Sequence, residues 1–466
     1  MSRAVELVCE ACGHLAGPLE AAPYPFACPE SSRGGADHLL APRLDTTRLR
    51  WPEGDDPSPF VRYRALLHAH QAALELGLGD EGYLELVREL DADVEAVDGV
   101  GFRTTPLEHQ ASLDALSGAT TLVKDETGNV SGSHKARHLF GIALHLEIVR
   151  RAGLEPSPAP PLSIASCGNA ALAAAVVAKA AARALEVHVP PDASPAVLDR
   201  LARLGASILV HARGPGELGD PCVVAFRDEV REGAIPFGCQ GTDNGLTLDG
   251  GRTLAFEIVD QLAALGPVDR VFVQVGGGAL ASALGRGLDE ARRLGALQRL
   301  PRLHPVQSER VAPVRAAYGR LLDELRARLP GLEAEALSAS GDQLADRLRS
   351  GPVLAAALAV LEAASRDRRL LFRPWPDPQP SVAHGILDDD TYDGLSLLRS
   401  TVLSGGSPVT VDEDTLVEAA TEMRDRAGIE VDETGAAGFA GLLQWSRSHG
   451  ALRGERVLVL ATGHRR

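Results

Sequence analysis

Residues 271–280 read Val-Phe-Val-Gln-Val-Gly-Gly-Gly-Ala-Leu, so three glycines directly follow a short apolar run. The β-branched and aromatic side chains of 271–275 predict a buried strand, and residues 281–294 predict the helix that follows it. A glycine turn at such a junction lets backbone N–H groups approach an anion, and the helix N-terminus favours negative charge. Residues 276–280 are therefore predicted to bind a phosphate group, with a tight packing turn as the alternative.

This glycine turn differs from the two common nucleotide-binding patterns. No lysine stands at the Walker position, and Ala281 occupies the place where the dinucleotide pattern G-x-G-x-x-G needs its last glycine. A nucleotide-binding reductase therefore finds poor support in the sequence.

The alternation of strand and helix recurs on both sides of the glycine turn. Predicted strands lie at 162–165, 185–189, 208–210 and 457–460, and predicted helices at 170–184 and 195–204. This rhythm indicates an α/β protein with mostly parallel, twisted sheets flanked by helices. Ligands of such sheets bind at the turns that follow the carboxyl ends of the strands.

Three other segments depart from that rhythm. Residues 51–59 form a turn-rich linker, and residues 61–78 predict an amphipathic helix. Residues 318–369 are rich in Leu, Ala, Arg and Glu with helical periodicity, which predicts an inserted helical hairpin at the surface or at an oligomer contact.

Length and charge exclude several classes of protein. A chain of 466 residues should hold at least two cores, and its net charge of −16 argues against a broad basic face for nucleic acid. No apolar run is long enough to span a membrane, and residues 1–6 lack the pattern of a signal peptide. We therefore expect a cytoplasmic protein without a nucleic-acid or membrane partner.

Lysine is scarce, since only three of the 47 basic Lys and Arg residues are lysines. Lys135 follows a Gly-Ser turn and begins a predicted helix, where the helix dipole and polar neighbours lower the pKa of an amine. Such an amine can form a Schiff base with an aldehyde cofactor. Lys124 stands beside two acidic residues and is interpreted as a salt-bridging group, and Lys179 as a side chain that reaches solvent from an Ala-rich helix. Drift toward arginine explains the scarcity itself.

Two more turns carry polar groups at the ends of predicted strands. The backbone amides of Ser166, Cys167 and Gly168 suit a carboxylate, and Asn169 adds a side-chain donor beside them. Thr462 follows the last predicted strand, where its hydroxyl could face a ring nitrogen.

The N-terminal segment contains part of a zinc-ribbon pattern. Cys9, Cys12 and Cys28 have the spacing of its first three ligands, but Ser31 stands where a fourth cysteine is expected. Either His14 or His38 could complete a tetrahedral site, and a degenerate ribbon without zinc is the alternative.

In this order, the motifs resemble the fold type II pyridoxal phosphate enzymes, and most closely threonine synthase. The matching segments are 105–107, 131–135, 166–169, 249–257, 306–313, 381–386, 428–437 and 462–464. The resemblance covers about residues 100–466, and the cysteine-bearing start is similar to the ribbon ahead of many threonine synthases. It implies two lobes with pyridoxal 5'-phosphate between them.

The resemblance also implies a role for each motif. Lys135 would form the Schiff base and later move the α-proton of the substrate. The backbone amides expected to hold the cofactor phosphate are those of Gly276, Gly277, Gly278, Ala279 and Leu280. Asn169 would bind the ring hydroxyl oxygen, Ser166, Cys167 and Gly168 the substrate carboxylate, and Thr462 the pyridine nitrogen. A neutral hydroxyl at that nitrogen weakens the electron sink, which suits elimination and replacement better than transamination.

The chain departs from threonine synthases at several positions. His134 and Ala136 flank the lysine where that family has Phe and Asp, and Cys167 and Ala170 replace hydroxyl residues that help to bind the substrate phosphate. The lysines that bind this phosphate have no counterpart either, with Arg137 or His138 as candidate substitutes.

Together these observations predict a lyase or synthase with a small amino-acid substrate. We expect β- or γ-elimination or replacement on an α-amino acid by a homodimer. The alternatives are a true threonine synthase, converting O-phosphohomoserine to threonine and phosphate, and a catalytically inactive binding protein on the same fold. The expected divisions are a degenerate ribbon-like segment at 1–50, the first part of the large lobe at 51–130, the small lobe at 131–240, and the rest of the large lobe at 241–466.

Overall fold

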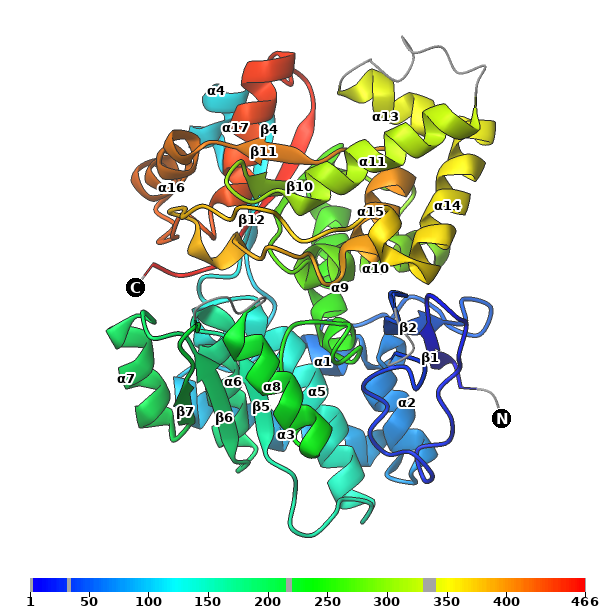
Figure 1. Ribbon diagram of the computed structural model, residues 1–466, viewed down its shortest axis with the longest axis vertical. Helices are drawn as coiled ribbons and strands as arrows, with labels where there is room; N and C mark the ends of the chain where they lie inside the picture. Colours follow the sequence, from blue (N-terminus) through cyan, green and yellow to red (C-terminus); the bar gives the residue numbers. More distant parts are fainter. Residues whose placement is uncertain (1–2, 32–34, 215–219, 330–340, 466) are drawn as a thin grey trace.

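Two separate β-sheets divide the molecule into two lobes, which lie one above the other in Figure 1. The computed structural model describes residues 3–31, 35–214, 220–329 and 341–465. The predicted α/β class with helices flanking mostly parallel sheets is confirmed.

The larger sheet has six strands in the order β11-β10-β9-β12-β4-β3. Its strands are β3 (Leu107–His109), β4 (Thr120–Asp125), β9 (Arg270–Gln274), β10 (Arg302–Ser308), β11 (Val409–Val411) and β12 (Arg456–Ala461). All neighbours are parallel except β3, which pairs antiparallel with β4. The strands predicted at 271–275 and 457–460 are thus central strands of one sheet.

Helices cover both faces of this sheet because successive side chains of a strand point to opposite faces. Val271 and Val273 of β9 join the core on the side of α9 (Thr247–Leu265), α10 (Ala279–Arg293) and α15 (Gly394–Ser404). Phe272 between them joins the core on the other side. That side is covered by α4 (Ala111–Ser117), α16 (Glu413–Ala427) and α17 (Ala437–His449).

The smaller sheet is parallel throughout, with the strand order β7-β6-β5-β8. Its strands are β5 (Leu162–Ala165), β6 (Leu185–Val189), β7 (Ser207–Val210) and β8 (Ile235–Pro236). The helices of this lobe include α5 (Lys135–Arg151), α6 (Asn169–Ala180), α7 (Pro195–Leu204) and α8 (Pro221–Glu232). The strands and helices predicted between 162 and 210 are confirmed.

The segment predicted as one amphipathic helix at 61–78 is broken into α1 (Pro59–Arg62), the 3₁₀ turn η1 (Arg64–Leu66) and α2 (His68–Glu75). The break occurs because the distant Asp249 carboxylate accepts the N–H groups of His68, at 2.9 Å, and Ala69, at 3.1 Å, and so starts a new helix. Helix α2 and the following α3 (Gly79–Asp98) pack against α5 in the smaller lobe. Within the expected grouping of residues 51–130 with the larger lobe, α2 and α3 therefore lie with the smaller lobe, whereas β3 and β4 belong to the larger sheet.

Helix α9 runs from one lobe to the other and crosses α5 at close range (Figure 1). At this crossing, a Cβ on Gly141 would lie 2.7 Å from Gly250 Cα, so only glycines allow the two backbones to approach. The crossing fixes α5, and with it Lys135, against both lobes.

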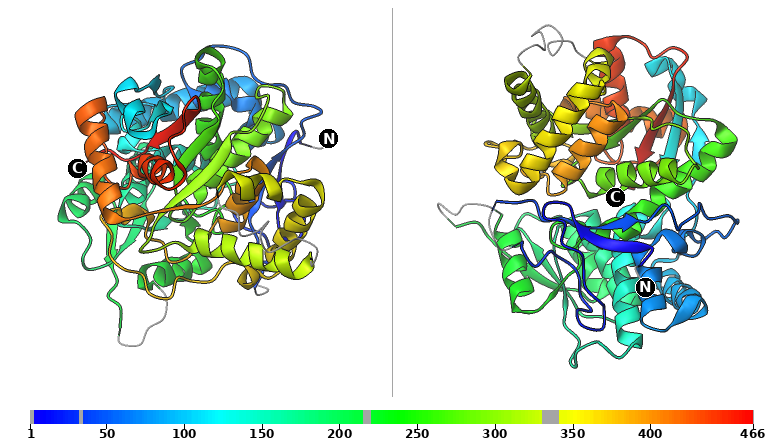
Figure 2. Two further views of the ribbon diagram at one scale, coloured as in Figure 1. Left: turned by 90° about the horizontal axis from the view of Figure 1, so that it is seen from above. Right: turned by 90° about the vertical axis from the view of Figure 1, so that its right-hand side faces the viewer.

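The described part of the predicted helical insertion contains α11 (Pro313–Arg328), α13 (Asp342–Leu348) and α14 (Gly351–Arg366), which pack on the larger lobe beside α15, and positions 330–340 of the prediction lie outside the described residues. No single helix among the described residues is long and apolar enough to cross a membrane; α13 and α14 meet those criteria only as a pair bent by 82°. The N-terminal strands β1 (Val5–Cys9) and β2 (Leu40–Leu44) pair antiparallel, and Figure 2 shows them beside the boundary between the lobes.

Candidate active site

The turn that carries Lys135 is joined to the turn after the last strand. Gly132 O accepts a hydrogen bond from His464 N at 2.9 Å, and Ser133 pairs with Gly463 in an antiparallel bridge. Lys135 is the first residue of α5. Two motifs more than 300 positions apart in the sequence thus lie side by side.

The Lys135 amine is half-buried and has neither a hydrogen bond nor an ion pair within the described part of the chain. His134 and His138 are buried on the same turn, and burial together with the charge on Lys135 lowers the pKa of both imidazoles, that of His138 to about 3. Both rings are therefore neutral at pH 7, and the amine remains free to react.

Residues 166–169 of the smaller lobe form a third turn, the asparagine turn, which lies beside Gly463. Asn169 begins α6, and its Nδ2 lies 3.0 Å from the position that a Cβ would take on Gly463. Ser166 Oγ accepts a hydrogen bond from Gly168 N at 3.4 Å, which shapes the turn. Cys167 at its tip is exposed as a residue, but the loss of water around its thiol, followed by the charge on Asp192, raises the pKa of the thiol. The thiol is therefore uncharged near neutral pH.

The glycine turn after β9 has no room for side chains. A Cβ on Gly276 would collide with the Asp388 carboxylate, and one on Gly277 would lie 3.0 Å from the Tyr392 ring. Gly278 has a φ of +100°, a conformation that side chains rarely adopt, and α10 begins directly after it. The turn therefore presents backbone N–H groups, including the first ones of α10, which have no partner within the helix.

Two buried polar atoms beside this turn lack a partner among the described residues. They are Thr391 Oγ1 and Asp393 Oδ1, whose side chains lie against Gly278. Burial raises the pKa of Asp393 to about 8, so this carboxyl group carries a proton at neutral pH and is able to donate it in a hydrogen bond. A phosphate group is the kind of acceptor that unpaired N–H and O–H groups require, so these residues fit the phosphate of pyridoxal 5'-phosphate.

Thr462 is buried and already accepts a hydrogen bond. Gln274 Nε2 donates to its Oγ1, and the orientation of this amide is fixed because Nε2 also donates to Gly435 O at 2.8 Å and Leu460 O at 3.3 Å. Since the hydroxyl accepts from Gln274, its own proton is available to another acceptor. That arrangement fits an unprotonated pyridine nitrogen.

A buried ionic network contains Arg137, which lies two residues after Lys135 on α5. Arg137 contacts Glu126 at 2.8 Å and Glu257 at 2.6 Å, and Lys124 Nζ contacts Glu257 at 2.8 Å. The four side chains are at most 1% exposed. The interpretation of Lys124 as a salt-bridging residue is confirmed, whereas its partner Glu257 is 133 positions away and was not identified from the sequence.

The network corrects one expectation about the substrate. Arg137 is held by two buried carboxylates, and His138 Nδ1 is hydrogen-bonded to Thr247 O at 2.8 Å. Neither side chain is free to replace the phosphate-binding lysines of threonine synthase.

Asp388 was missed from the sequence although it follows the matching segment 381–386. A run of three aspartates, 388–390, normally indicates a solvated turn. In the structure the carboxylate of Asp388 instead lies against the glycine turn.

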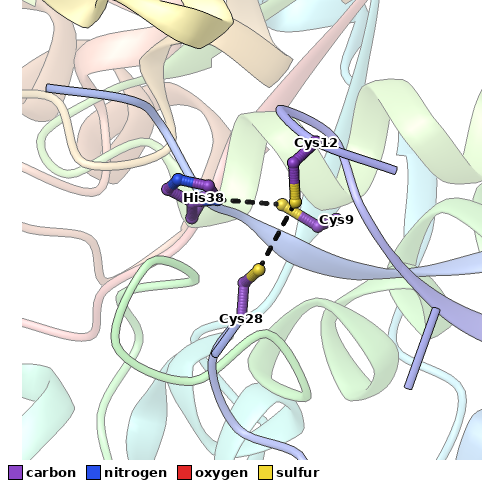
Figure 3. A group of neighbouring side chains, drawn as sticks. All are labelled: Cys9, Cys12, Cys28 and His38. Atoms are coloured by element: carbon purple, nitrogen blue, oxygen red, sulfur yellow. Dashed lines mark hydrogen bonds between the residues drawn. The ribbon is translucent and has the colours of Figure 1, made fainter. Parts of the chain in front are cut away.

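The cysteines at the N-terminus converge with one of the two candidate histidines (Figure 3). Cys9 Sγ lies 3.4 Å from His38 Nδ1, Cys12 Sγ lies 3.6 Å from Cys28 Sγ, and all four ligand atoms lie within 4.8 Å of one another. Sulfur ligands at about 2.3 Å from a tetrahedral zinc ion are about 3.8 Å apart, so this donor set fits zinc. His38, rather than His14, stands at the fourth position.

A family model described as pyridoxal-phosphate dependent enzyme matches residues 100–371. The chain belongs to this family. The matched range contains Lys135, the asparagine turn and the glycine turn. The resemblance to fold type II pyridoxal phosphate enzymes is thereby confirmed.

Curated relatives of this pyridoxal-phosphate-dependent enzyme include threonine synthase of Methanocaldococcus jannaschii, 24% identical over 364 residues that cover 77% of this chain and 74% of the relative. L-serine dehydratase of Saccharomyces cerevisiae is 28% identical over 197 residues, 40% of this chain and 56% of the relative.

Solved structures show the same fold. The processed form of threonine deaminase isoform 2 from Solanum lycopersicum is 15% identical with a TM-score of 0.55, covering 83% of this chain and 85% of that one. Diaminopropionate ammonia lyase from Escherichia coli is 16% identical with a TM-score of 0.55, covering 82% and 89%. The names of these proteins refer to different reactions. The family of this chain is therefore established, but its own reaction has to be argued from its site.

Proposed function

We propose that this chain is a lyase that catalyses β- or γ-elimination or replacement on an α-amino acid. The observation that carries the proposal is the convergence of an unpaired lysine amine with three turns from two lobes, each turn offering neutral hydrogen-bond donors. Relatives named as threonine synthase and L-serine dehydratase support the same class of reaction.

In this proposal the motifs hold pyridoxal 5'-phosphate between the lobes. Lys135 Nζ would bind its aldehyde carbon, Asn169 its ring oxygen, and Thr462 its ring nitrogen. The phosphate would lie on the N–H groups of residues 276–280. When bound, the cofactor supplies an electron sink for the Cα of an amino acid.

The chain itself orients the substrate and moves its proton. The amides of Ser166, Cys167 and Gly168 would bind the substrate carboxylate, which places Cα near Lys135. The Lys135 amine would then take the α-proton as a general base. Because Thr462 offers a neutral hydroxyl and no carboxylate, it would leave the ring nitrogen of a bound cofactor unprotonated, which would favour elimination or replacement over transamination.

Threonine synthase activity on O-phosphohomoserine is the alternative within the family. Its support is the relative of that name, which matches 77% of this chain. The charges that act on Cys167, in contrast, are those of Asp192, Asp220 and Asp388, which repel a substrate phosphate. An inactive binding protein on this fold is the other alternative, and the unpaired amine of Lys135 argues against it.

A substrate screen with the purified protein tests the proposal. We expect bound pyridoxal phosphate to give a visible absorbance band that responds to some α-amino acids, with release of ammonia, phosphate or a 2-oxo acid. Lys135→Ala should lose both the band and turnover, whereas Lys179→Ala, an exposed control on α6, should keep both. A Lys135→Ala protein that retains the band would refute the role of this lysine. Phosphate release from O-phosphohomoserine would establish the threonine synthase alternative.

We also propose a zinc ion at Cys9, Cys12, Cys28 and His38, a homodimeric assembly and a cytoplasmic location. The donor set supports the zinc ion. The assembly is tested by light scattering of the purified protein, and the location by cell fractionation.

A further inference from the structure

Asp388 lies where three motifs of the proposed active site meet. A Cβ on Gly276 would collide with its carboxylate, and the neighbouring Gly277 N–H favours the charged form of this group. Lys135 is the cation that acts on it most strongly, and Asp388 in turn acts on Cys167 in the asparagine turn. The carboxylate therefore faces the space between the lysine, the glycine turn and the predicted carboxylate-binding turn.

The segment around Asp388 is anchored on both sides. Before it, Gly385 N donates to Thr434 Oγ1 at 3.0 Å. After it, the Asp389 carbonyl accepts from Trp375 N at 2.7 Å, and the Asp390 carboxylate pairs with Arg368 at 2.5 Å. These contacts hold the half-buried Asp388 side chain in place before any ligand binds, as a reacting group requires.

Burial and the surrounding charges set the pKa of Asp388 close to neutral pH. Burial raises its pKa to about 6, the negative charge of Asp389 adds to this effect, and Lys135 and the Gly277 N–H oppose it. The Tyr392 hydroxyl and the Cys167 thiol also face it, and the pKa of each is raised, so both are uncharged. Lys135 is the cation with the largest effect on Asp388.

We propose that Asp388 is the acid that protonates the leaving group of a β-hydroxy substrate. The inference rests on the proposed function and extends it to a residue outside the motifs. It follows from the position of the carboxylate against Gly276 and Gly277, together with the charge of Lys135 that acts on it.

The step balances without another reactant. Lys135 Nζ takes the α-proton, and the electron pair left on Cα forms the second bond between Cα and Cβ. The bond between Cβ and oxygen breaks with its electron pair on the oxygen, which takes the proton of the Asp388 carboxyl group and leaves as water. The Lys135 ammonium group then returns its proton to the Asp388 carboxylate, and both residues regain their starting states.

This role also sets the class of leaving group. A hydroxyl group is a poor leaving group unless it is protonated, so it gains most from an acid. A phosphate group gains less from an acid, and the carboxylate of Asp389, whose charge Arg213 opposes, would repel it. We therefore expect alcohol substrates to be used and their phosphate esters to be rejected.

The test compares leaving groups that do and do not need a proton. L-serine and L-threonine lose hydroxyl, whereas β-chloro-L-alanine loses chloride, which needs no acid. Asp388→Asn should lower kcat for the hydroxyl substrates by about 10²-fold or more, the usual contribution of a general acid, and leave chloride release within a few-fold of wild type. Asp377→Asn removes an exposed carboxylate from the segment that leads to Asp388 and should keep both activities. The visible cofactor band, equal in all three proteins, controls for folding and cofactor content.

The pH profile gives a second readout. Since the acid must be protonated, kcat/KM for L-serine or L-threonine should fall as the pH rises through about 6, and this limb should be absent with β-chloro-L-alanine.

Each contrary result has one meaning. If Asp388→Asn loses both activities equally, or keeps hydroxyl elimination, Asp388 is not the acid. If wild type releases chloride but dehydrates neither hydroxyl substrate, the inference fails and the proposed function stands. If wild type carrying the cofactor band releases neither leaving group, the proposed function fails, and the inference with it.

Discussion

Replacing Glu257 by glutamine should destabilise the protein far more than the loss of an ordinary salt bridge. Glu257 bridges Arg137 at 2.6 Å and Lys124 at 2.8 Å with no exposed side-chain surface. Two cations and two carboxylates balance in this network, so the neutral amide leaves one buried positive charge uncompensated. Removing one partner of a buried ion pair costs about 3–5 kcal/mol.

Urea titration of the free energy of unfolding measures this cost, for variants whose m-value is unchanged. The matched control is Glu418→Gln, because Glu418 pairs with Arg447 at 2.5 Å while their side chains are 37% and 49% exposed. An exposed pair of this kind contributes about 0–1 kcal/mol. We expect the two substitutions to differ by at least about 2 kcal/mol.

The pH dependence has a defined sign. Burial alone would raise the pKa of Glu257, but Arg137 and Lys124 hold it below its usual value. A lowered pKa contributes stability above the unfolded value, about 4.3, and this contribution is lost as the pH falls through the folded value. The difference in the free energy of unfolding between wild type and Glu257→Gln should therefore become smaller as the pH falls.

A double-mutant cycle separates charge balance from packing. Lys124→Met alone leaves an excess negative charge, whereas Lys124→Met with Glu257→Gln restores one carboxylate for one guanidinium. The double variant should be less destabilised than the sum of the single variants by about 0.5–3 kcal/mol. Additive effects, or a cost of Glu257→Gln below about 1 kcal/mol, would refute charge compensation as the reason for the network.

Two further predictions concern the ends of the chain. Thr462→Asp should increase abortive transamination relative to elimination, because a carboxylate would keep the ring nitrogen protonated. Gln274 Nε2 can still donate to the new side chain, so cofactor binding should persist. The ratio of transamination to elimination products measures the first effect, and an unchanged ratio would place Thr462 away from the ring. Elemental analysis should find about one zinc ion per chain in the wild type and none in Cys28→Ser. Cys222 is buried outside the cluster, so Cys222→Ser should keep the zinc ion. Equal zinc content in the two variants would contradict the site.

The strands and the motif order could be predicted because they depend on local pattern. The apolar runs at 162–165 and 185–189 coincide with β5 and β6, and the helix at 195–204 with α7. Glycine turns after strands can also be recognised from the sequence, because glycine adopts backbone conformations that other residues rarely adopt. Local signals of the same kind single out Lys135 among the three lysines, and its role with the cofactor stays a prediction.

The remaining features depend on contacts between distant residues. Asp249 splits the helix expected at 61–78 from 180 positions away, and Glu257 reaches Lys124 from 133 positions away. Asp388 belongs to a run of aspartates, in which Asp389 is exposed and the Asp390 carboxylate pairs with Arg368. Composition cannot distinguish the one member of an acidic run that packs on the glycine turn from the other two.

The three lysines show why residue scarcity gains meaning only in context. Lys179 Nζ reaches a carbonyl of α7 at the surface, a contact that arginine would also make. Lys124 fills a buried slot where its amine donates to Glu257, Gln261 Oε1 and Thr105 O, all within 2.9 Å, and the planar guanidinium of arginine does not suit this three-way arrangement. Lys135 alone has no such partner among the described residues, and its neighbouring histidines are neutral. The glycine turn offers a phosphate its backbone N–H groups and adds no competing cation, so an anionic cofactor can bind next to an amine that remains nucleophilic. An arginine at 135 could bind the same anion, but it could not give up its proton.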